Sequence, residues 1–275
     1  NIEIRGHVLT RKIFVPRAWQ SPIIEHVTQI DVPRTGVWAG MGLGKTTATA
    51  TALDYLYVAG EIAGPTLVAA PLRVASSTWP DEIAKWDHLR NLEVTTIVGT
   101  PKERERALAR AFSHGYANIY TINYENLTWL EETLKAWRKA WPFELVVPDE
   151  ATKLKGLRMS VRTSTKGKEW VQGQGSRRAK SLAQYAHRGI RRLIELTGTP
   201  APNGLKDLWG QAWFLDGGAR LGHSYEAFMQ RWFRPTRDGH GVEPLPHAQA
   251  QIEAALRDLC LTLDIRDYVD IAEPI

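Results

Sequence analysis

Short apolar runs alternate with longer amphipathic segments between residues 36 and 196. The runs are rich in branched side chains and bounded by polar, glycine or proline residues, which predicts buried strands at 36–39, 66–70, 94–98, 118–121, 144–147 and 193–196. The intervening segments, such as 46–57, 101–113 and 125–140, have the length and apolar spacing of helices. This alternation predicts an α/β fold in which helices sandwich a mainly parallel sheet.

The rest of the chain departs from this alternation. Residues 156–176 are rich in Gly, Ser, Thr, Lys and Arg, so we expect a mobile basic loop inserted after a strand. Residues 204–263 contain helical stretches and predict a helical C-terminal extension packed on the same domain. Residues 264–275 are similar to the start of a linker. The main domain is therefore expected to cover residues 1–203.

Composition is that of an ordinary globular chain. Hydrophobic residues make up 43% and charged residues 24% of the 275 positions. No apolar run approaches the roughly 20 residues that a membrane span needs. Cys260 is the single cysteine, which excludes an internal disulfide and a cysteine-based zinc site and favours a reducing compartment. We therefore expect a cytoplasmic protein without a membrane contact.

The net charge of +5 is distributed unevenly. Residues 153–192 hold twelve Lys or Arg and one acid, a local charge of +11 that leaves about −6 for the rest of the chain. Such a concentration of positive charge is what binding of a polyphosphate such as DNA requires. A solvated loop without a partner explains the same charges equally well, so charge alone leaves both interpretations open.

A glycine-rich loop follows the first predicted strand. Residues 40–46 read Gly-Met-Gly-Leu-Gly-Lys-Thr. Glycine allows the backbone to approach a phosphate, and successive N–H groups together with the next helix N-terminus attract an anion. In such a P-loop the lysine reaches the β- and γ-phosphates and the threonine hydroxyl binds Mg²⁺. We expect ATP to bind at Gly42, Leu43, Gly44, Lys45, Thr46 and Thr47.

Two acids follow the predicted strand at 144–147. Asp149 and Glu150 stand where an open α/β sheet binds its ligands, at the carboxyl end of a strand. An aspartate there can hold Mg²⁺, and the next glutamate can orient and deprotonate the attacking water. The alternative is an acid pair that caps a helix. Together with a P-loop roughly a hundred residues upstream, the pair favours nucleotide hydrolysis.

These motifs carry a family resemblance. Residues 40–46, the Asp-Glu-Ala-Thr run at 149–152 and the Thr-Gly-Thr-Pro run at 197–200 resemble motifs I, II and III of superfamily 2 helicases. The first motif and the Pro-Leu-Arg-Val run at 71–74 resemble the Swi/Snf branch, in particular its phage and prophage members. The resemblance extends from about Arg17 to Tyr268. It implies that residues 1–203 form a RecA-like ATP-binding lobe and that 264–275 lead to a second lobe absent from this chain.

The resemblance also implies residue roles. The catalytic residues would be Lys45, Asp149 and Glu150, with Thr46 and Asp149 as Mg²⁺ ligands. Gln20 matches a glutamine whose amide reads the adenine edge, and Thr197 and Thr199 would couple the nucleotide site to movement. The residues implied to contact a nucleic-acid backbone without sequence preference are Arg73, Thr121, Asn123, Tyr124, Lys153, Lys155, Arg177 and Arg178.

Two positions depart from the family pattern. Ala39 stands where the general P-loop has its first glycine and where the family often has an acid. Pro148 replaces an apolar residue before Asp149 and removes one backbone N–H at the strand end. Neither change touches the lysine, threonine or acids of the nucleotide site, so we expect nucleotide chemistry to survive.

The favoured function is the first ATPase lobe of an ATP-dependent DNA helicase or translocase. Its cofactors would be ATP and Mg²⁺, and its partners double-stranded DNA and a second RecA-like lobe, in a monomer within a bacterial or phage-infected cell. Hydrolysis by this lobe alone is expected to be slow, because an arginine finger from the second lobe is worth roughly 10³ to 10⁵ in rate. Two alternatives stay open, a non-enzymatic nucleic-acid-binding module with a vestigial nucleotide site and a P-loop phosphotransferase acting on a small molecule.

Overall fold

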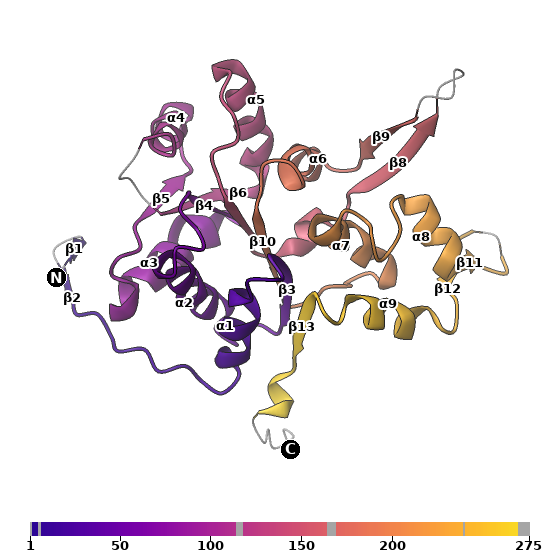
Figure 1. The fold of residues 1–275 in the computed structure, drawn as a ribbon, viewed down its shortest axis with the longest axis horizontal. Coiled ribbons are helices and arrows are strands. Elements are labelled where there is room, and N and C mark those ends of the chain that lie inside the picture. Colours follow the sequence, from indigo (N-terminus) through magenta and orange to yellow (C-terminus); the bar gives the residue numbers. More distant parts are fainter. Residues whose placement is uncertain (1, 5–6, 114–117, 164–168, 239, 269–275) are drawn as a thin grey trace.

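A parallel β-sheet forms the centre of the molecule (Figure 1). The structure is a computed structural model and describes residues 2–4, 7–113, 118–163, 169–238 and 240–268. The sheet has the strand order β13-β3-β10-β7-β4-β6-β5, with every neighbouring pair parallel. Its strands are β3 (Arg34–Ala39), β4 (Thr66–Ala70), β5 (Val94–Ile97), β6 (Ile119–Asn123), β7 (Leu145–Pro148), β10 (Arg192–Thr197) and β13 (Cys260–Leu263). All six apolar runs of the sequence are strands of this sheet, which confirms the predicted α/β fold.

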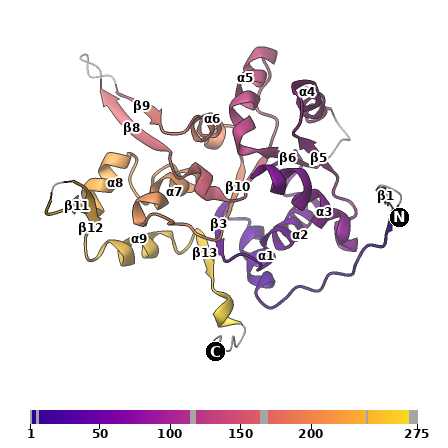
Figure 2. The ribbon, with the colours of Figure 1, turned by 180° about the vertical axis from the view of Figure 1, so that it is seen from behind.

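Helices cover both faces of the sheet (Figure 1 and Figure 2). One face packs against α1 (Gln20–Thr28), α2 (Lys45–Val58) and α3 (Trp79–Lys85). The other face packs against α4 (Pro101–Arg110), α5 (Leu127–Trp137), α6 (Arg177–Ala186) and α7 (Leu208–Asp216). Strand residues alternate between the two cores, as the period of a strand requires, so Leu193 and Ile194 enter opposite clusters. In the described part of the chain, no helix has the length and apolar character needed to cross a membrane.

The amino edge of the sheet is tied to the ends of two helices by one arginine. Arg34, the first residue of β3, donates from its guanidinium to the carbonyls of Phe214, Ile190 and Ala186. Carbonyls near a helix C-terminus lack intrahelical donors, so a guanidinium satisfies several of them at once. Burial lowers the pKa of Arg34 from its ordinary value. This contact fixes α6 and α7 against the sheet.

The basic segment is a β-hairpin, so the prediction of a mobile loop was wrong. Strands β8 (Arg158–Thr163) and β9 (Glu169–Gln174) pair antiparallel along six residues each. Figure 1 shows the hairpin extending away from the sheet beside α6. Residues 164–168 of the predicted loop lie outside the described residues. Polar and apolar residues alternate from Arg158 to Val161, which is strand periodicity that the polar composition concealed.

Tertiary contacts anchor the base of this hairpin to α8 (Tyr225–Trp232). The Ser160 hydroxyl donates to Glu226 Oε1 over 2.7 Å. The guanidinium carbon of Arg158 lies 3.9 Å from the centroid of the Tyr225 ring, a cation–π contact. Contacts between residues some 65 positions apart cannot be inferred from local composition, which explains the wrong expectation.

The C-terminal extension is only partly helical. The helices α7, α8 and α9 (Ala248–Leu256) follow the prediction, but β11 (Phe233–Pro235) and β12 (Val242–Pro244) form an antiparallel pair. Strand β13 then returns to the main sheet and pairs with β3. Gly36 permits this close approach, because a Cβ there would come within 2.8 Å of Cys260 Sγ. The extension predicted at 204–263 therefore contains strands as well as helices, and it supplies one strand of the main sheet.

Candidate functional site

The three sequence motifs meet at the carboxyl edge of the sheet. Strand β3 leads into the P-loop, β7 into Asp149 and Glu150, and β10 into the turn at 197–200. Because β10 lies between β3 and β7, its turn falls between the P-loop and the acids. Ligands of open α/β sheets bind at this edge.

The P-loop has the backbone geometry of an anion cradle. Gly42 and Gly44 have φ angles of +80° and +69°, a region that residues with a side chain rarely adopt. Helix α2 begins at Lys45 without a capping side chain, so its first N–H groups are available to a ligand. The Trp19 indole donates from Nε1 to the Leu43 carbonyl over 3.1 Å and ties the loop to the start of α1.

The Lys45 side chain is hydrogen-bonded to the start of the P-loop and lies near the acid pair. Its Nζ donates to the carbonyls of Ala39 and Gly40 over 2.6 and 2.9 Å. Burial lowers the pKa of Lys45, while the nearby carboxylates of Asp149 and Glu150 act in the opposite direction. The ammonium group therefore lies within the field of both acids, at the place where a phosphate would contact the loop.

Asp149 is held by three contacts. Its Oδ2 accepts a hydrogen bond from Trp79 Nε1 over 2.9 Å. Its carbonyl accepts from the Tyr124 hydroxyl over 2.9 Å, and its amide donates to the Ala69 carbonyl over 2.8 Å. Burial raises the pKa of Asp149, and the Trp79 hydrogen bond and the charge of Lys45 oppose that rise. The carboxylate is thus fixed in place and costly to ionise unless a cation is near.

Glu150 occupies the left-handed region of backbone space. Its φ angle is +64°, which is uncommon for a residue other than glycine and occurs at functional sites. It precedes the short 3₁₀ turn Ala151–Leu154, and its carboxylate makes no capping hydrogen bond there. The alternative that the acid pair serves as a helix cap therefore has no support from the geometry.

The turn after β10 packs directly against the P-loop. A Cβ on Gly198 would lie 3.4 Å from the Ala39 carbonyl oxygen and 3.6 Å from the Met41 amide nitrogen. Thr197 is buried, and its Oγ1 accepts from the Thr199 amide over 3.2 Å, whereas Thr199 is exposed. The two threonines therefore lie between the buried strand and the surface of the site.

Three of the residues expected to bind nucleotide have side chains that make contacts within the protein. Gln20 is buried, and its Nε2 donates to the Gly44 carbonyl over 3.3 Å. The Thr47 hydroxyl donates to Glu82 Oε2 over 2.8 Å, toward α3. The Leu43 side chain lies in the core. These side chains hold the loop in shape, while Thr46, half-buried beside Lys45, stays at the site.

The residues expected to contact nucleic acid fall into two groups. Arg73, Lys153 and Arg177 have exposed side chains. Arg178 is partly exposed, donates to the Lys153 carbonyl over 3.1 Å and lies 3.6 Å from a carboxylate oxygen of Glu125. These four residues bring positive charge to the carboxyl edge of the sheet.

The second group is engaged inside the protein, contrary to expectation. Thr121 and Tyr124 are fully buried, so their side chains cannot reach a nucleic acid. Asn123 is 8% exposed, and its side chain is hydrogen-bonded to Glu125 and Asn126. The reason is packing: Thr121 and Asn123 belong to β6, an interior strand of a sheet whose two faces are covered by helices. Tyr124, in the turn after β6, enters one of the two cores.

Lys155 also has a structural partner. Its Nζ lies 2.9 Å from Oδ2 of Asp207, a carboxylate that is 6% exposed and also accepts from the Asn203 amide. Leaving a buried carboxylate without a cation would be costly. Lys155 therefore neutralises charge inside the lobe rather than presenting it to a partner.

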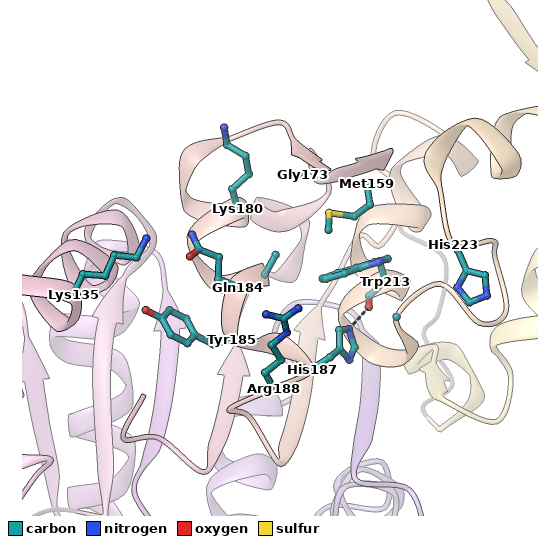
Figure 3. Close-up of a pocket in the computed structure, with 12 residues that line it drawn as sticks. Lys135, Met159, Gly173, Lys180, Gln184, Tyr185, His187, Arg188, Trp213 and His223 are labelled. Atoms are coloured by element: carbon teal, nitrogen blue, oxygen red, sulfur yellow. Dashed lines mark hydrogen bonds between the residues drawn. The ribbon is translucent and has the colours of Figure 1, made fainter. Parts of the chain in front are cut away.

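A separate cleft lies along α6, on the opposite face of the sheet from α2 (Figure 3). It has a volume of about 840 Å³, and its walls include Lys180 and Tyr185 of α6 and Trp213 of α7. Figure 3 shows His187 bonded to the Trp213 carbonyl, over 2.9 Å. None of its lining residues belongs to the P-loop, the acid pair or the 197–200 turn, so it is distinct from the motif site.

Comparison with known proteins places the chain in a family. A family model described as the SNF2-related domain matches residues 37–270. The chain belongs to the SNF2-related domain family. Putative protein p41 of Acyrthosiphon pisum secondary endosymbiont phage 1 is 48% identical over 268 residues, 96% of this chain and 54% of that protein. Transcription regulatory protein SNF2 of Saccharomyces cerevisiae is 30% identical over 221 residues, 80% of this chain and 11% of that protein.

Solved structures agree with this SNF2-related assignment. The Sulfolobus solfataricus SWI2/SNF2 ATPase core in complex with dsDNA matches with a TM-score of 0.65 and 21% identity, over 96% of this chain and 49% of that chain. At this identity the match shows the fold, which is that of a RecA-like lobe. The chain spans about half the length of the phage protein and of this core. The expected Swi/Snf resemblance is thereby confirmed.

Two residues of this SNF2-related chain follow the Pro-Leu-Arg-Val run and resemble the same branch of the family, but sequence reasoning gave them no role at the nucleotide site. Trp79 and Glu82 of α3 bond to Asp149 and Thr47, respectively. Trp79 is buried, and the local sequence gives no sign of its hydrogen bond. Their spacing of three residues places both side chains on one face of a helix, and that was the available signal.

Proposed function

We propose that this chain is the first ATPase lobe of an ATP-dependent DNA translocase or helicase. One observation carries the proposal. Lys45, Asp149 and the 197–200 turn follow three adjacent strands and lie together at one edge of the sheet. In this proposal residues 42–47 bind the triphosphate, and Thr46 and Asp149 hold Mg²⁺. Bound Mg²⁺ would neutralise charge on the transferring phosphoryl group.

The residues present fit magnesium and ATP. The uncapped start of α2 and the Lys45 ammonium supply donors for phosphate oxygens. Mg²⁺ at nucleotide sites is commonly held by one or two protein carboxylates together with phosphates and water, and Asp149 supplies such a carboxylate. Glu150 follows it directly and is partly exposed; in this proposal it would orient the attacking water and accept a proton from it. Gln20 borders Gly44 and would exchange that contact for the adenine edge.

We propose double-stranded DNA as the nucleic-acid partner. Arg73, Lys153 and Arg177 are the exposed cations among the residues expected to face it, and they follow β4, β7 and the hairpin near the same edge of the sheet. Such contacts to phosphates fix position without reading sequence. The dsDNA named for the Sulfolobus ATPase core supports this choice.

A second lobe is proposed to complete hydrolysis. The chain covers about half of the phage relative and of the Sulfolobus core, which supports a further lobe in the working protein. A charge-stabilising arginine supplied from outside raises phosphoryl-transfer rates by roughly 10³ to 10⁵. The lobe itself then contributes nucleotide binding, cation binding and water orientation.

Substitution of the P-loop lysine tests the nucleotide site. Lys45→Ala is expected to weaken binding of ATP with Mg²⁺ by about tenfold or more, because a hydrogen bond to a charged group is worth about 1.5–3 kcal/mol. Titration calorimetry on the 275-residue chain measures it. Lys180→Ala is the matched control, because Lys180 lines the separate cleft, and it should bind as tightly as the wild type.

Equal affinity of the wild type and Lys45→Ala would contradict the proposal. Combined with DNA binding that survives in both proteins, it would support the alternative of a nucleic-acid-binding module with a vestigial nucleotide site.

A further inference from the structure

A buried tryptophan donates a hydrogen bond to the carboxylate proposed to hold magnesium. Trp79 is 0% exposed, and its Nε1 lies 2.9 Å from Oδ2 of Asp149, which is 6% exposed. An indole N–H has a single proton to donate, and a bond to an ionised acceptor is about twice as strong as a neutral one. The direction of the Asp149 carboxylate is therefore set by a side chain outside the three motifs.

The position of Trp79 is set by an unusual turn. Residues Val74–Thr78 form a π-helix, and the Trp79 amide donates to the Val74 carbonyl, five residues back. The Thr121 hydroxyl donates to the Ala75 carbonyl over 2.6 Å and so braces this turn from β6. Single π-helical turns are rare and often occur at functional sites. Arg73, one of the exposed cations, immediately precedes the turn.

The same short helix also contacts the other half of the nucleotide site. Glu82, three residues after Trp79, accepts from the Thr47 hydroxyl over 2.8 Å and from Trp86 Nε1 over 2.9 Å. Thr47 lies in the first turn of α2, directly after the residues that line the P-loop. Helix α3 thus makes polar contacts with both the acid strand and the P-loop helix.

We propose that Trp79 is a positioning residue for the magnesium carboxylate, and that the π-helical turn braced by Thr121 sets its place. The inference rests on the proposed function, because it assumes that Asp149 holds Mg²⁺ beside ATP. In this arrangement the Trp79 N–H fixes the position of one carboxylate oxygen of Asp149. The turn then links the exposed Arg73 to the cation site through a continuous set of bonded residues.

A merely structural role makes a different prediction. If Trp79 only fills space, its replacement by another aromatic residue lowers stability and weakens ATP binding to the same extent with and without magnesium. If it positions the carboxylate, the loss is confined to the part of the affinity that depends on magnesium. The two readings are therefore separated by the ratio of ATP affinity with Mg²⁺ to ATP affinity in EDTA.

The test compares Trp79→Phe with a matched control. Trp209→Phe removes an equally buried indole whose Nε1 bonds to the Gly222 carbonyl, away from the site. Trp79→Phe is expected to lower the magnesium-dependent ratio by about tenfold, the effect of one hydrogen bond to a charged group. Trp209→Phe should leave the ratio unchanged within about twofold. Thermal unfolding of both variants verifies that each is folded at the temperature of the titration.

The outcomes are distinct. A wild type that shows no magnesium-dependent gain contradicts the proposed function itself. If the wild type shows the gain and Trp79→Phe retains it in full, only the role of Trp79 is overturned. Thr121→Val preserves the shape of the side chain but removes its hydrogen bond to the Ala75 carbonyl, so it should lower the magnesium-dependent affinity ratio several-fold. A ratio equal to that of the wild type in Thr121→Val overturns the role of the turn.

Discussion

Residues that the sequence suggests equally strongly as site residues differ in orientation and burial in the structure. The placement of Lys45 and Asp149 at the carboxyl edge of the sheet was predictable, because local pattern alone, a glycine loop or an acid after a strand, indicates it. Thr121 and Tyr124 belong to an equally suggestive segment, but both are buried and donate their hydroxyls to carbonyls of Ala75 and Asp149. The orientation of a side chain depends on which strands and turns lie beside its residue, and those neighbours come from distant parts of the chain.

Glu195 is a further residue whose state depends on its surroundings. It lies in β10 and is 0% exposed, and within the described residues neither carboxylate oxygen has a hydrogen-bond partner. Burial raises its pKa well above the ordinary 4.5. The buried Tyr124 and Cys260 are among the titratable groups whose pKa values its charge would affect. An unpaired buried acid of this kind is held in the neutral form.

The free energy of unfolding should therefore depend on pH through Glu195. Above about pH 4.5 the unfolded chain releases this proton and the folded chain keeps it, so stability falls as the pH rises toward the folded pKa. The loss approaches about 1.4 kcal/mol for each pH unit in that window. Glu195→Gln cannot titrate, so its stability advantage over the wild type should grow between pH 5 and pH 8 in urea unfolding. Parallel pH profiles of the two proteins would contradict this.

At the scale of elements, the strongly patterned strands were predictable and the weakly patterned ones were not. The buried parallel strands are recognisable in the sequence as apolar runs, because both faces of the sheet are covered. Strands β8 and β9 lie in a segment of polar composition, and β13 has only four residues, with three residues between it and α9, so none of them stands out locally. Both are stabilised by distant partners, α8 for the hairpin and β3 for the last strand.

The two lysines after the acid pair should differ because they belong to different environments. Lys155→Met removes the cation paired with buried Asp207, and the free energy of unfolding should fall by about 1–3 kcal/mol. Lys153→Met changes an exposed side chain, so stability should stay within about 0.5 kcal/mol while DNA affinity falls. Urea unfolding and a DNA-binding titration at low salt measure both. A stable Lys155→Met with reduced DNA affinity would restore the original expectation for Lys155.

At the scale of the whole molecule, the proposed ATP site has one of its halves in this chain. The order β3-β10-β7 brings the P-loop, the 197–200 turn and the acids together without any contribution from outside the chain. That part of the site was predictable, because strand order in a RecA-like lobe follows from the family resemblance. The support that α3 gives to Asp149 and Thr47 was not, because a hydrogen bond between residues 70 positions apart leaves no local pattern.

The proposed function is tested most directly by the steady-state rate of ATP hydrolysis by the 275-residue chain at saturating double-stranded DNA. We predict binding of ATP with Mg²⁺ but turnover roughly 10³-fold or more below that of a complete motor, because the proposed second lobe would supply the charge-stabilising arginine. DNA-stimulated turnover of about 10 s⁻¹, typical of a complete enzyme, would contradict it.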